Sequence, residues 1–515
     1  MHFLFLLLAP IIAAAQPNNS IEDAMKGLLS QLFNGDDDPE DSLTSTSHTI
    51  ETADGTFDYT AVTGLLPQYD DAGQKLGEMF FTAYLKEDYD PTRPLTFVFN
   101  GGPGGSSLSM HIAGFGPRRL LYPEEGQGSK SPFHLIDNPQ TILNLTDIVM
   151  VDPIGTGYSK TDNEAYESFA FGVEGDIVSF AEFIRVFCVQ FDRWTSPKYL
   201  IGASYGTCRA CGLAEDLMAS SGIYLDGIIL LGSALDMNTI FPQRDLYLSE
   251  CLKIPTYAAT AWYHGRTNHQ KSLQETVDFA RRFAMEDYAP AMAEPTRLTK
   301  IEQKAFYQQL AELIGLPETT IARYQGRITE EVYVTEFKAQ ERKVIGGIDS
   351  RYEGDISTVG HEYFEDPSYR NFRPAFAPAF MQYLQEELQT GSIINKYKNF
   401  SVEALYRWDW RMFDAGYQPT RPNFLQRLRR TLVANPTMQV FIGSGYYDIR
   451  TPFAAVEYSI DHLELPESYR SNFQFEYYEA GHGFIFDLAS LEKLKVDLTQ
   501  FYNDRLIHNS KSTRK

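Results

Sequence analysis

The sequence predicts an α/β fold: a mostly parallel central sheet flanked by helices, with an inserted, largely helical cap. The first observation is that short apolar runs of strand length recur along the 515 residues and alternate with segments of helical spacing. That alternation is typical of a parallel sheet with helices on both faces. The second is that strand-like runs become rare between residues 236 and 431, where segments such as LQETVDFARRFAMEDY follow the period of a helix.

The expected elements begin with a β-hairpin. FDYTAVTGLLP and GEMFFTAYL alternate or cluster apolar residues on either side of the turn sequence DDAG. VEGDIVSFAEFIRVFCVQF carries apolar residues at helical spacing and is expected to be a helix between two strands. Further strands are expected at residues 95–100 and 147–152, at YLIG ending at Gly202, at residues 227–232, at MQVFIG ending at Gly443 and at FQFEYYE ending at Glu479.

Composition divides the chain into six parts. An apolar N-terminal run followed by small residues predicts a signal peptide over residues 1–15, with a membrane anchor as the alternative. Residues 16–44 contain NGDDDPEDS and are interpreted as an acidic leader or linker. The remaining boundaries are predicted as the first part of the core at 45–235, the helical cap at 236–431, the second part of the core at 432–507 and a polar tail at 508–515.

Net charge and targeting signals limit the binding partners and the cellular compartments that are expected. The formal net charge of -23 argues against nucleic acid or an anionic membrane surface as a partner. With a cleaved signal peptide, the mature protein is expected outside the cell or in an acidic compartment of the secretory route, such as a vacuole or lysosome. Asn18, Asn144 and Asn399 occupy N-glycosylation sequons, and Asn18 is discounted because it lies so close to the cleavage site.

The cysteines raise the question of disulfides or a metal site. Cys188, Cys208, Cys211 and Cys251 allow three disulfide pairings in a secreted chain. Cys208 and Cys211 form a C-x-x-C, but the sequence shows no second Cys or His pair at zinc spacing. Buried thiols or one or two disulfides are therefore expected, and neither a metal nor a cofactor.

Three residues at the ends of predicted strands point to nucleophilic catalysis. Ser204 lies in GASYG, where a tight strand-to-helix turn would present its hydroxyl. Asp448 follows a later strand in a glycine-rich turn, and His482 lies between two glycines after the last strand. The order serine, acid, histidine is that of α/β-hydrolases. An aspartate that only satisfies its own turn and a loop histidine without a role are the alternatives.

A glycine-rich loop early in the chain is the expected oxyanion site. In FVFNGGPGGSS a strand ends at a run of glycines, which lets backbone N–H groups approach a reacting carbonyl. A phosphate-binding loop is the alternative, but no G-K-S/T follows.

Five motifs together resemble the serine carboxypeptidases, peptidase family S10, which have the α/β-hydrolase fold. The motifs are NGGPGGSS, VDPIGTGYS, GASYGT, GYYDIRTP and AGHGF, in that order, and the resemblance is greatest to the bacterial-type branch. It implies a catalytic triad and backbone sites around it. The implied roles are nucleophile for Ser204, base for His482, its orienting acid for Asp448, oxyanion donors for Gly102 and Tyr205, and binding of the substrate carboxylate for Asn100 and Gly101.

Two departures from the family pattern concern that carboxylate. The family has a glutamate before the nucleophile and another before a Gly-Pro pair, and these positions are Ala203 and Gly114 here. Loss of both acids removes a recognition device and leaves the bond-breaking residues intact. Arg118, Arg119 and Arg209 are candidates for a replacement positive group, with an ordinary structural role as the alternative.

The sequence therefore favours a secreted serine carboxypeptidase acting on the C-termini of peptides or proteins through an acyl-enzyme. An esterase or acyltransferase on the same scaffold, and a non-catalytic binding protein, are the alternatives. The sequence leaves open whether the chain forms a homodimer.

Overall fold

A computed structural model describes residues 43–512 except 71, 88–89, 122–130, 244–245, 268–270, 358–365, 391–396 and 413–420. The described residues form a nine-stranded sheet with the order β1-β2-β3-β7-β4-β8-β9-β12-β13. Neighbours from β7 to β13 run parallel, whereas β1, β2, β3 and β7 pair antiparallel. The predicted signal peptide, and the leader as far as residue 42, lie outside the described residues.

The predicted strands are confirmed to within a few residues. The hairpin is β2 (Gly55–Tyr69) with β3 (Lys75–Lys86), and the added first strand is β1 (Leu43–Thr52). The remaining strands of the large sheet are β4 (Leu95–Phe99), β7 (Asp147–Val151), β8 (Lys198–Ala203), β9 (Gly227–Leu231), β12 (Gln439–Gly445) and β13 (Phe473–Tyr478). Two small antiparallel pairs are β5 (Arg118–Leu120) with β6 (Leu135–Asp137), and β10 (Lys343–Ile345) with β11 (Glu353–Asp355).

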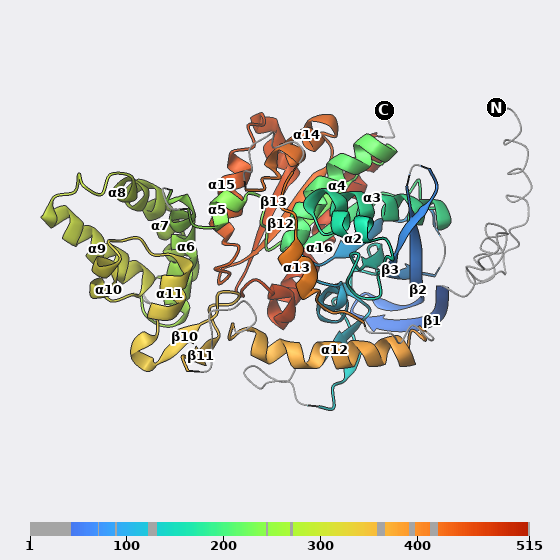
Figure 1. Cartoon of the computed structure of the whole chain (residues 1–515), viewed down its shortest axis with the longest axis horizontal. Coiled ribbons are helices and arrows are strands. Elements are labelled where there is room, and N and C mark those ends of the chain that lie inside the picture. The colour runs from blue at the N-terminus through green and yellow to red at the C-terminus, as the bar shows by residue number, and fades with distance from the viewer. Residues whose placement is uncertain are drawn as a thin grey trace, which may run out of the picture.

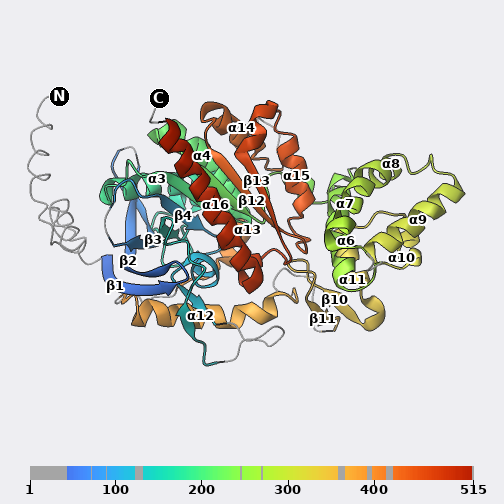
Figure 2. The same cartoon turned by 180° about the vertical axis from the view of Figure 1, so that it is seen from behind.

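Helices cover both faces of the sheet, as Figures 1 and 2 show. Alternate residues of the central strands point to opposite layers: Phe97 and Phe99 of β4 join one apolar cluster and Val98 the other. The first layer is formed by α2 (Glu164–Ala170), α3 (Val173–Gln190), α4 (Tyr205–Ser221), α14 (Leu425–Ala434) and α15 (Phe453–Asp461). The second is formed by the π-helix η2 (Met110–Phe115), α12 (Tyr369–Glu386) and α16 (Leu488–Ser512), which runs into the predicted polar tail.

The inserted region divides into a separate lobe and segments that rejoin the core. The lobe lies at one end of the molecule in Figure 1 and has its own apolar cluster. In contrast, α13 (Val402–Arg407) and α14 pack on the core cluster, although α13 falls inside the predicted cap and α14 begins inside it. The lobe and the segment that leads into it from the core contain α5 (Met237–Ile240), α6 (Leu248–Tyr263), α7 (Leu273–Phe283), α8 (Ala289–Ala293), α9 (Lys300–Ile314), α10 (Glu318–Arg323) and α11 (Glu330–Glu336).

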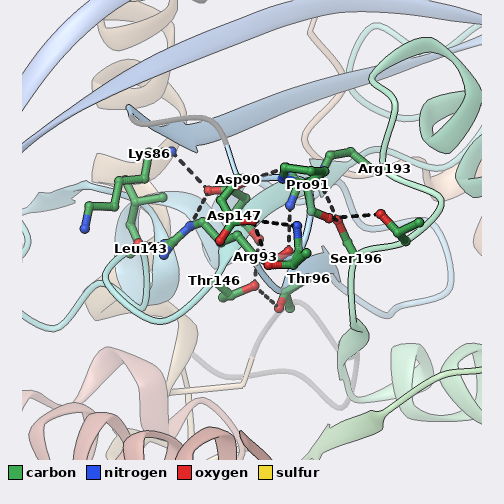
Figure 3. Close-up of polar contacts among 12 residues, drawn as sticks. Lys86, Asp90, Pro91, Arg93, Thr96, Leu143, Thr146, Asp147, Arg193 and Ser196 are labelled. Atoms are coloured by element: carbon green, nitrogen blue, oxygen red, sulfur yellow. Dashed lines mark hydrogen bonds and ion pairs between the residues drawn. The ribbon is translucent and has the colours of Figure 1, made fainter. Parts of the chain in front are cut away.

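A buried ion network lies where strands β4 and β7 begin (Figure 3). Asp147 accepts from Arg93 at 2.8 Å and from Arg193 at 2.6 Å, and the Arg193 side chain is only 3% exposed. Arg193 also donates to the carbonyl of Arg93 and to Ser196, whose hydroxyl donates to the carbonyl of Pro91. The network ties the segment before β4 to the segment before β8, at the opposite end of these strands from Ser204.

Asp147→Asn is expected to lower the free energy of unfolding by about 3 kcal/mol, because it leaves buried arginines without their carboxylate. Urea unfolding measures the change. Asp461→Asn is the control, since its pair with Arg470 is largely exposed, at 62% and 74%, and a change below about 0.5 kcal/mol is expected. Equal midpoints for the two variants would contradict a stabilising role for the buried network.

Candidate active site

Ser204 lies on a strained turn between β8 and α4. Its φ of 57° and ψ of -126° are unusual for a residue with a side chain, and such strain costs on the order of 1–3 kcal/mol. The flanking glycines make the turn sterically feasible, because a Cβ on Gly202 would lie 2.1 Å from the carbonyl oxygen of Gly206. The Ser204 side chain makes no capping hydrogen bond to α4. The tight strand-to-helix turn predicted at Ser204 is therefore present.

His482 and Asp448 meet at the ends of the last two strands of the sheet. Asp448 follows β12 and is fully buried, and its Oδ2 lies 2.7 Å from Nδ1 of His482, which follows β13. Burial alone would lower the pKa of His482, but the charge of Asp448 and its hydrogen bond outweigh that effect. The pKa of His482 is therefore raised above its ordinary value of 6.5, against a smaller opposing effect of Arg450.

The histidine lies beside the strand that neighbours the elbow. The N–H of Ser204 donates to the carbonyl of Leu231 at the end of β9. A Cβ on the next residue, Gly232, would lie 3.0 Å from Nδ1 and 3.1 Å from Cε1 of His482. A side chain there would collide with the imidazole, so Gly232 leaves room for His482 beside the end of β9, the strand to which the N–H of Ser204 is bonded.

The glycine-rich loop after β4 packs against the same elbow. A Cβ on Gly101 would lie 2.5 Å from the backbone nitrogen of Tyr205, so only glycine allows this approach. Gly102 is exposed and has a φ of 119°. The Asn100 side chain donates to Ser109 at 3.1 Å, and the Asn100 carbonyl accepts from Arg209 at 2.7 Å. The structure thus places Gly101 directly against the backbone nitrogen of Tyr205.

Thr451 is a site residue that sequence reasoning missed. Its N–H donates to Oδ1 of Asp448 at 2.9 Å and its hydroxyl donates to Oδ2 at 2.5 Å. The hydroxyl oxygen also lies 3.0 Å from Nδ1 of His482. An aspartate followed three residues later by threonine in a turn is the sequence signal that could have indicated it.

Part of the insertion forms a strap, residues 347–350, between the acid loop and the histidine loop. The Gly347 carbonyl accepts from the N–H of Ile449 at 3.1 Å, and the Ile348 carbonyl accepts from the N–H of His482 at 2.7 Å. Asp349 accepts from the N–H of Gly481 at 2.9 Å. The sequence contains no local pattern for these contacts, because the partners are about 100 residues or more apart.

Two arginines considered for carboxylate binding have structural partners instead. Arg209 is fully buried and makes two hydrogen bonds to Asp176, at 2.8 and 2.9 Å. Arg118 on β5 pairs with Asp137 and with Glu387. For Arg209 the structural role that the sequence left as the alternative is the correct one, because its charge is already neutralised away from solvent.

The positions of the two missing family acids are apolar. Ala203 packs against the second apolar cluster. A Cβ on the buried Gly114 would lie 3.5 Å from the Ile485 side chain. No carboxyl group at either position faces the elbow.

The cysteines and sequons occupy ordinary structural positions. All four thiols are free and buried, so buried thiols, and not disulfides, describe this structure. Burial raises the pKa of Cys211 to about 12, which makes it unreactive near neutral pH.

Two of the three sequon asparagines make side-chain hydrogen bonds. The Asn144 amide donates to Asp54 at 2.7 Å, and Asn399 accepts from Ser106 at 3.3 Å, whereas Asn18 lies outside the described residues. Among the helices described, none has the length and apolar character needed to cross a bilayer.

Comparison with known proteins gives a family match over most of the chain. Residues 52–496 match the family model described as serine carboxypeptidase. The chain is 26% identical over 209 residues to "Pheromone-processing carboxypeptidase KEX1" of Yarrowia lipolytica, covering 40% of this chain and 31% of that protein. It is 33% identical over 129 residues to "Carboxypeptidase Y homolog" of Arthroderma benhamiae, covering 25% of this chain and 23% of that protein. The matched segments thus span less than a third of either relative.

A solved structure shows the same fold over nearly the whole chain. It is the crystal structure of Kex1(delta)p, a prohormone-processing carboxypeptidase from Saccharomyces cerevisiae, with a TM-score of 0.50 and 17% identity. It covers 92% of this chain and 94% of that chain, which confirms the predicted α/β-hydrolase fold. These relatives are fungal, and they give no support to the prediction of a bacterial-type branch.

Proposed function

The chain belongs to the serine carboxypeptidase family, and from that premise we propose that it is a secreted serine peptidase that removes C-terminal residues from peptides. The observation that carries the proposal is the 2.7 Å contact between His482 and a fully buried Asp448, together with a serine on a strained elbow. The predicted signal peptide supports the secretory route. The proposed substrates are the C-termini of peptides or proteins.

In the proposed mechanism, the Ser204 hydroxyl attacks the carbonyl carbon of the scissile peptide bond. His482 accepts the hydroxyl proton and then donates it to the leaving amine, while Asp448 stabilises the imidazolium that forms between these steps. The backbone N–H groups of Gly102 and Tyr205 stabilise the negative oxygen of the tetrahedral intermediate. Water then hydrolyses the acyl-enzyme by the same proton transfers in reverse. Asn100 and the Gly101 backbone are the proposed contacts of the substrate's terminal carboxylate.

A second candidate function is an esterase or acyltransferase on the same scaffold. It is favoured by Ala203 and Gly114, which provide no carboxyl group for recognition of a free C-terminus. Hydrolysis of matched peptides with a free or an amidated C-terminus separates the candidates. A carboxypeptidase prefers the free acid, whereas an esterase acts on esters without that preference. Labelling by a fluorophosphonate tests for any serine hydrolase, and a folded protein that resists labelling would contradict both.

The pH profile tests the role of His482. The base must be neutral, and because its pKa is raised above 6.5, kcat/KM is expected to rise from about pH 5 through pH 7 and to reach half its maximum above pH 6.5. Below that pKa the imidazole is protonated and cannot accept the serine proton. The measurement is kcat/KM against pH on a free-carboxyl peptide and its amide. A maximum of kcat/KM near pH 4–5 with strong preference for the free acid would contradict the assignment of the pH dependence to His482.

A further inference from the structure

Asp152 is a buried acid that the proposed mechanism does not use. It directly follows β7 and is only 1% exposed. Its Oδ1 accepts from the N–H and from the hydroxyl of Ser107, each at 2.7 Å. Ser107 is the last residue of the glycine-rich loop, which also contains Gly102, a proposed oxyanion donor. Asp152 therefore binds the loop at the end where the chain leaves it.

The backbone and the carboxyl group of Asp152 are both held in place. Its N–H donates to the carbonyl of Phe80 on β3 at 3.0 Å, and its carbonyl accepts from the hydroxyl of Ser159 at 2.7 Å. A Cβ on Gly157 would lie 1.8 Å from Oδ2 of Asp152. A side chain at position 157 would displace the carboxyl group, so the glycine leaves room for it.

A segment of the insertion, residues 397–401, supports the same half of the loop. The carbonyl of Asn399 accepts from the N–H of Ser106 at 3.0 Å, and the N–H of Ser401 donates to the carbonyl of Gly104 at 2.7 Å. The second half of the loop thus has two supports, one at the end of β7 and one in the insertion.

The first half of the loop is anchored by different groups. The Asn100 carbonyl accepts from Arg209 at 2.7 Å, and Gly101 packs against the backbone nitrogen of Tyr205. Asn100 and Gly101 are the proposed contacts of the substrate carboxylate. Loss of the support at Asp152 is therefore expected to displace residues 102–105 more than the proposed carboxylate contacts.

We propose that Asp152 is a positioning residue that holds the glycine-rich loop with the N–H of Gly102 directed at the developing oxyanion. This inference rests on the proposed function. The effect reaches Gly102 through the backbone, because the N–H of Gly105 donates to the carbonyl of Gly101 at 3.0 Å across the turn that contains Gly102. An oxyanion donor stabilises the transition state more than the bound substrate, so its displacement lowers kcat and leaves KM nearly unchanged.

The charge of Asp152 sets the pH of the test. Burial raises the pKa of Asp152 to about 6, against the opposing effects of hydrogen bonds from Ser107 and of Tyr397. At about pH 7.5 the group is therefore a carboxylate, and hydrogen bonds to a carboxylate are stronger than those to a neutral amide oxygen.

The test compares wild type with Asp152→Ala, which removes the acceptor, and with Asp152→Asn, which keeps one oxygen for Ser107. kcat and KM on a free-carboxyl dipeptide are measured at about pH 7.5, and thermal unfolding verifies that each variant is folded. Asp152→Ala is expected to lower kcat by about 100- to 1,000-fold, the effect of losing one oxyanion donor, with KM changed by about threefold at most. Asp152→Asn is expected to recover most of that loss. If Asp152→Ala does not fold, Asp152→Leu gives the same test, because it removes the acceptor and fills more of the space.

Two control variants separate positioning from stability. Asp147→Asn, at the other end of β7, is expected to lower the free energy of unfolding but to keep kcat within about threefold of wild type. Ser107→Ala removes the hydroxyl contact and keeps the N–H that donates to Asp152, so its kcat is also expected to stay within a few-fold of wild type. A kcat loss in Asp147→Asn as large as that in Asp152→Ala would mean that Asp152 acts through stability alone, which would overturn the inference.

Labelling by a fluorophosphonate separates this inference from the proposed function. Attack of the serine on phosphorus also places negative charge on an oxygen at the oxyanion site, so the labelling rate constant reports on the loop without a peptide. Labelling that is about 100-fold slower in folded Asp152→Ala supports the positioning role even if wild type hydrolyses no peptide, a result that would refute the carboxypeptidase function alone. A labelling rate and a kcat within about threefold of wild type, or a raised KM with unchanged kcat, would overturn the role of Asp152 and leave the proposed triad standing.

Discussion

Replacing Ser204 with alanine is expected to lower kcat by about 10⁵- to 10⁶-fold without unfolding the protein. Alanine keeps the Cβ and the backbone of the elbow but removes the oxygen that forms the acyl-enzyme in the proposed mechanism. Because the Ser204 side chain does not cap α4, its loss costs the helix no such hydrogen bond. Turnover of a free-carboxyl dipeptide and labelling by a fluorophosphonate measure the effect, and circular dichroism verifies the fold.

Ser106→Ala is the matched control for this substitution. Ser106 lies in the glycine-rich loop, where its hydroxyl donates to Asn399 at 3.3 Å and also interacts with Tyr397, and neither partner belongs to the proposed triad. Turnover within a few-fold of wild type is expected. Ser107→Ala is expected to retain turnover as well, although it removes a hydrogen bond to the buried Asp152. Near-normal turnover of the Ser204→Ala variant would exclude Ser204 as the nucleophile.

Asp448→Asn is expected to lower kcat by about 10⁴-fold in a protein that stays folded. The asparagine amide cannot hold the Nδ1–H of His482 and stabilise its positive charge at the same time. The contact from the N–H of Thr451 to Oδ1 can persist, which is why folding is expected to survive. Single-turnover kinetics and thermal unfolding measure the two effects.

Asp487→Asn tests the one other acid considered for this role. Asp487 pairs with Arg351 at 3.3 Å and accepts from the N–H of Ser490, so a few-fold loss at most is expected. If Asp448→Asn keeps activity within about threefold while Asp487→Asn loses it, the orienting acid is Asp487.

Most strands in the centre of the sheet could be predicted because they are buried on both faces and therefore form short, nearly continuous apolar runs. β8 and β9 are examples, since every residue from 198 to 202 and from 227 to 231 is buried. The elbow could be predicted for a local reason too, because its glycines stand within two residues of Ser204. Local patterns of this kind can be recognised in the sequence without knowing which residues pack against them.

The supporting residues could not be predicted, because their roles depend on partners distant in sequence. Asp349 reaches Gly481, and Glu330 reaches Arg450, across more than 100 residues. The two alternatives left open for Arg209 have the same origin. A basic residue near the nucleophile suggests an anion site until its partner Asp176, on a different helix, is known. β1 was missed because its residues are mostly polar and only Ile50 is buried.

The pairing of β9 with β12 has a consequence for how the protein folds. These neighbours in the sheet are separated in the chain by residues 232–438, so their contact closes a very long loop and is expected to form late. During synthesis β9 stays an unpaired edge, open to aggregation, after the elbow and the glycine-rich loop have been made. Asp448 and His482 arrive only with the last two strands. On the proposed mechanism, a nascent chain therefore has no hydrolytic capacity until those strands join the sheet, which protects the cell that synthesises it.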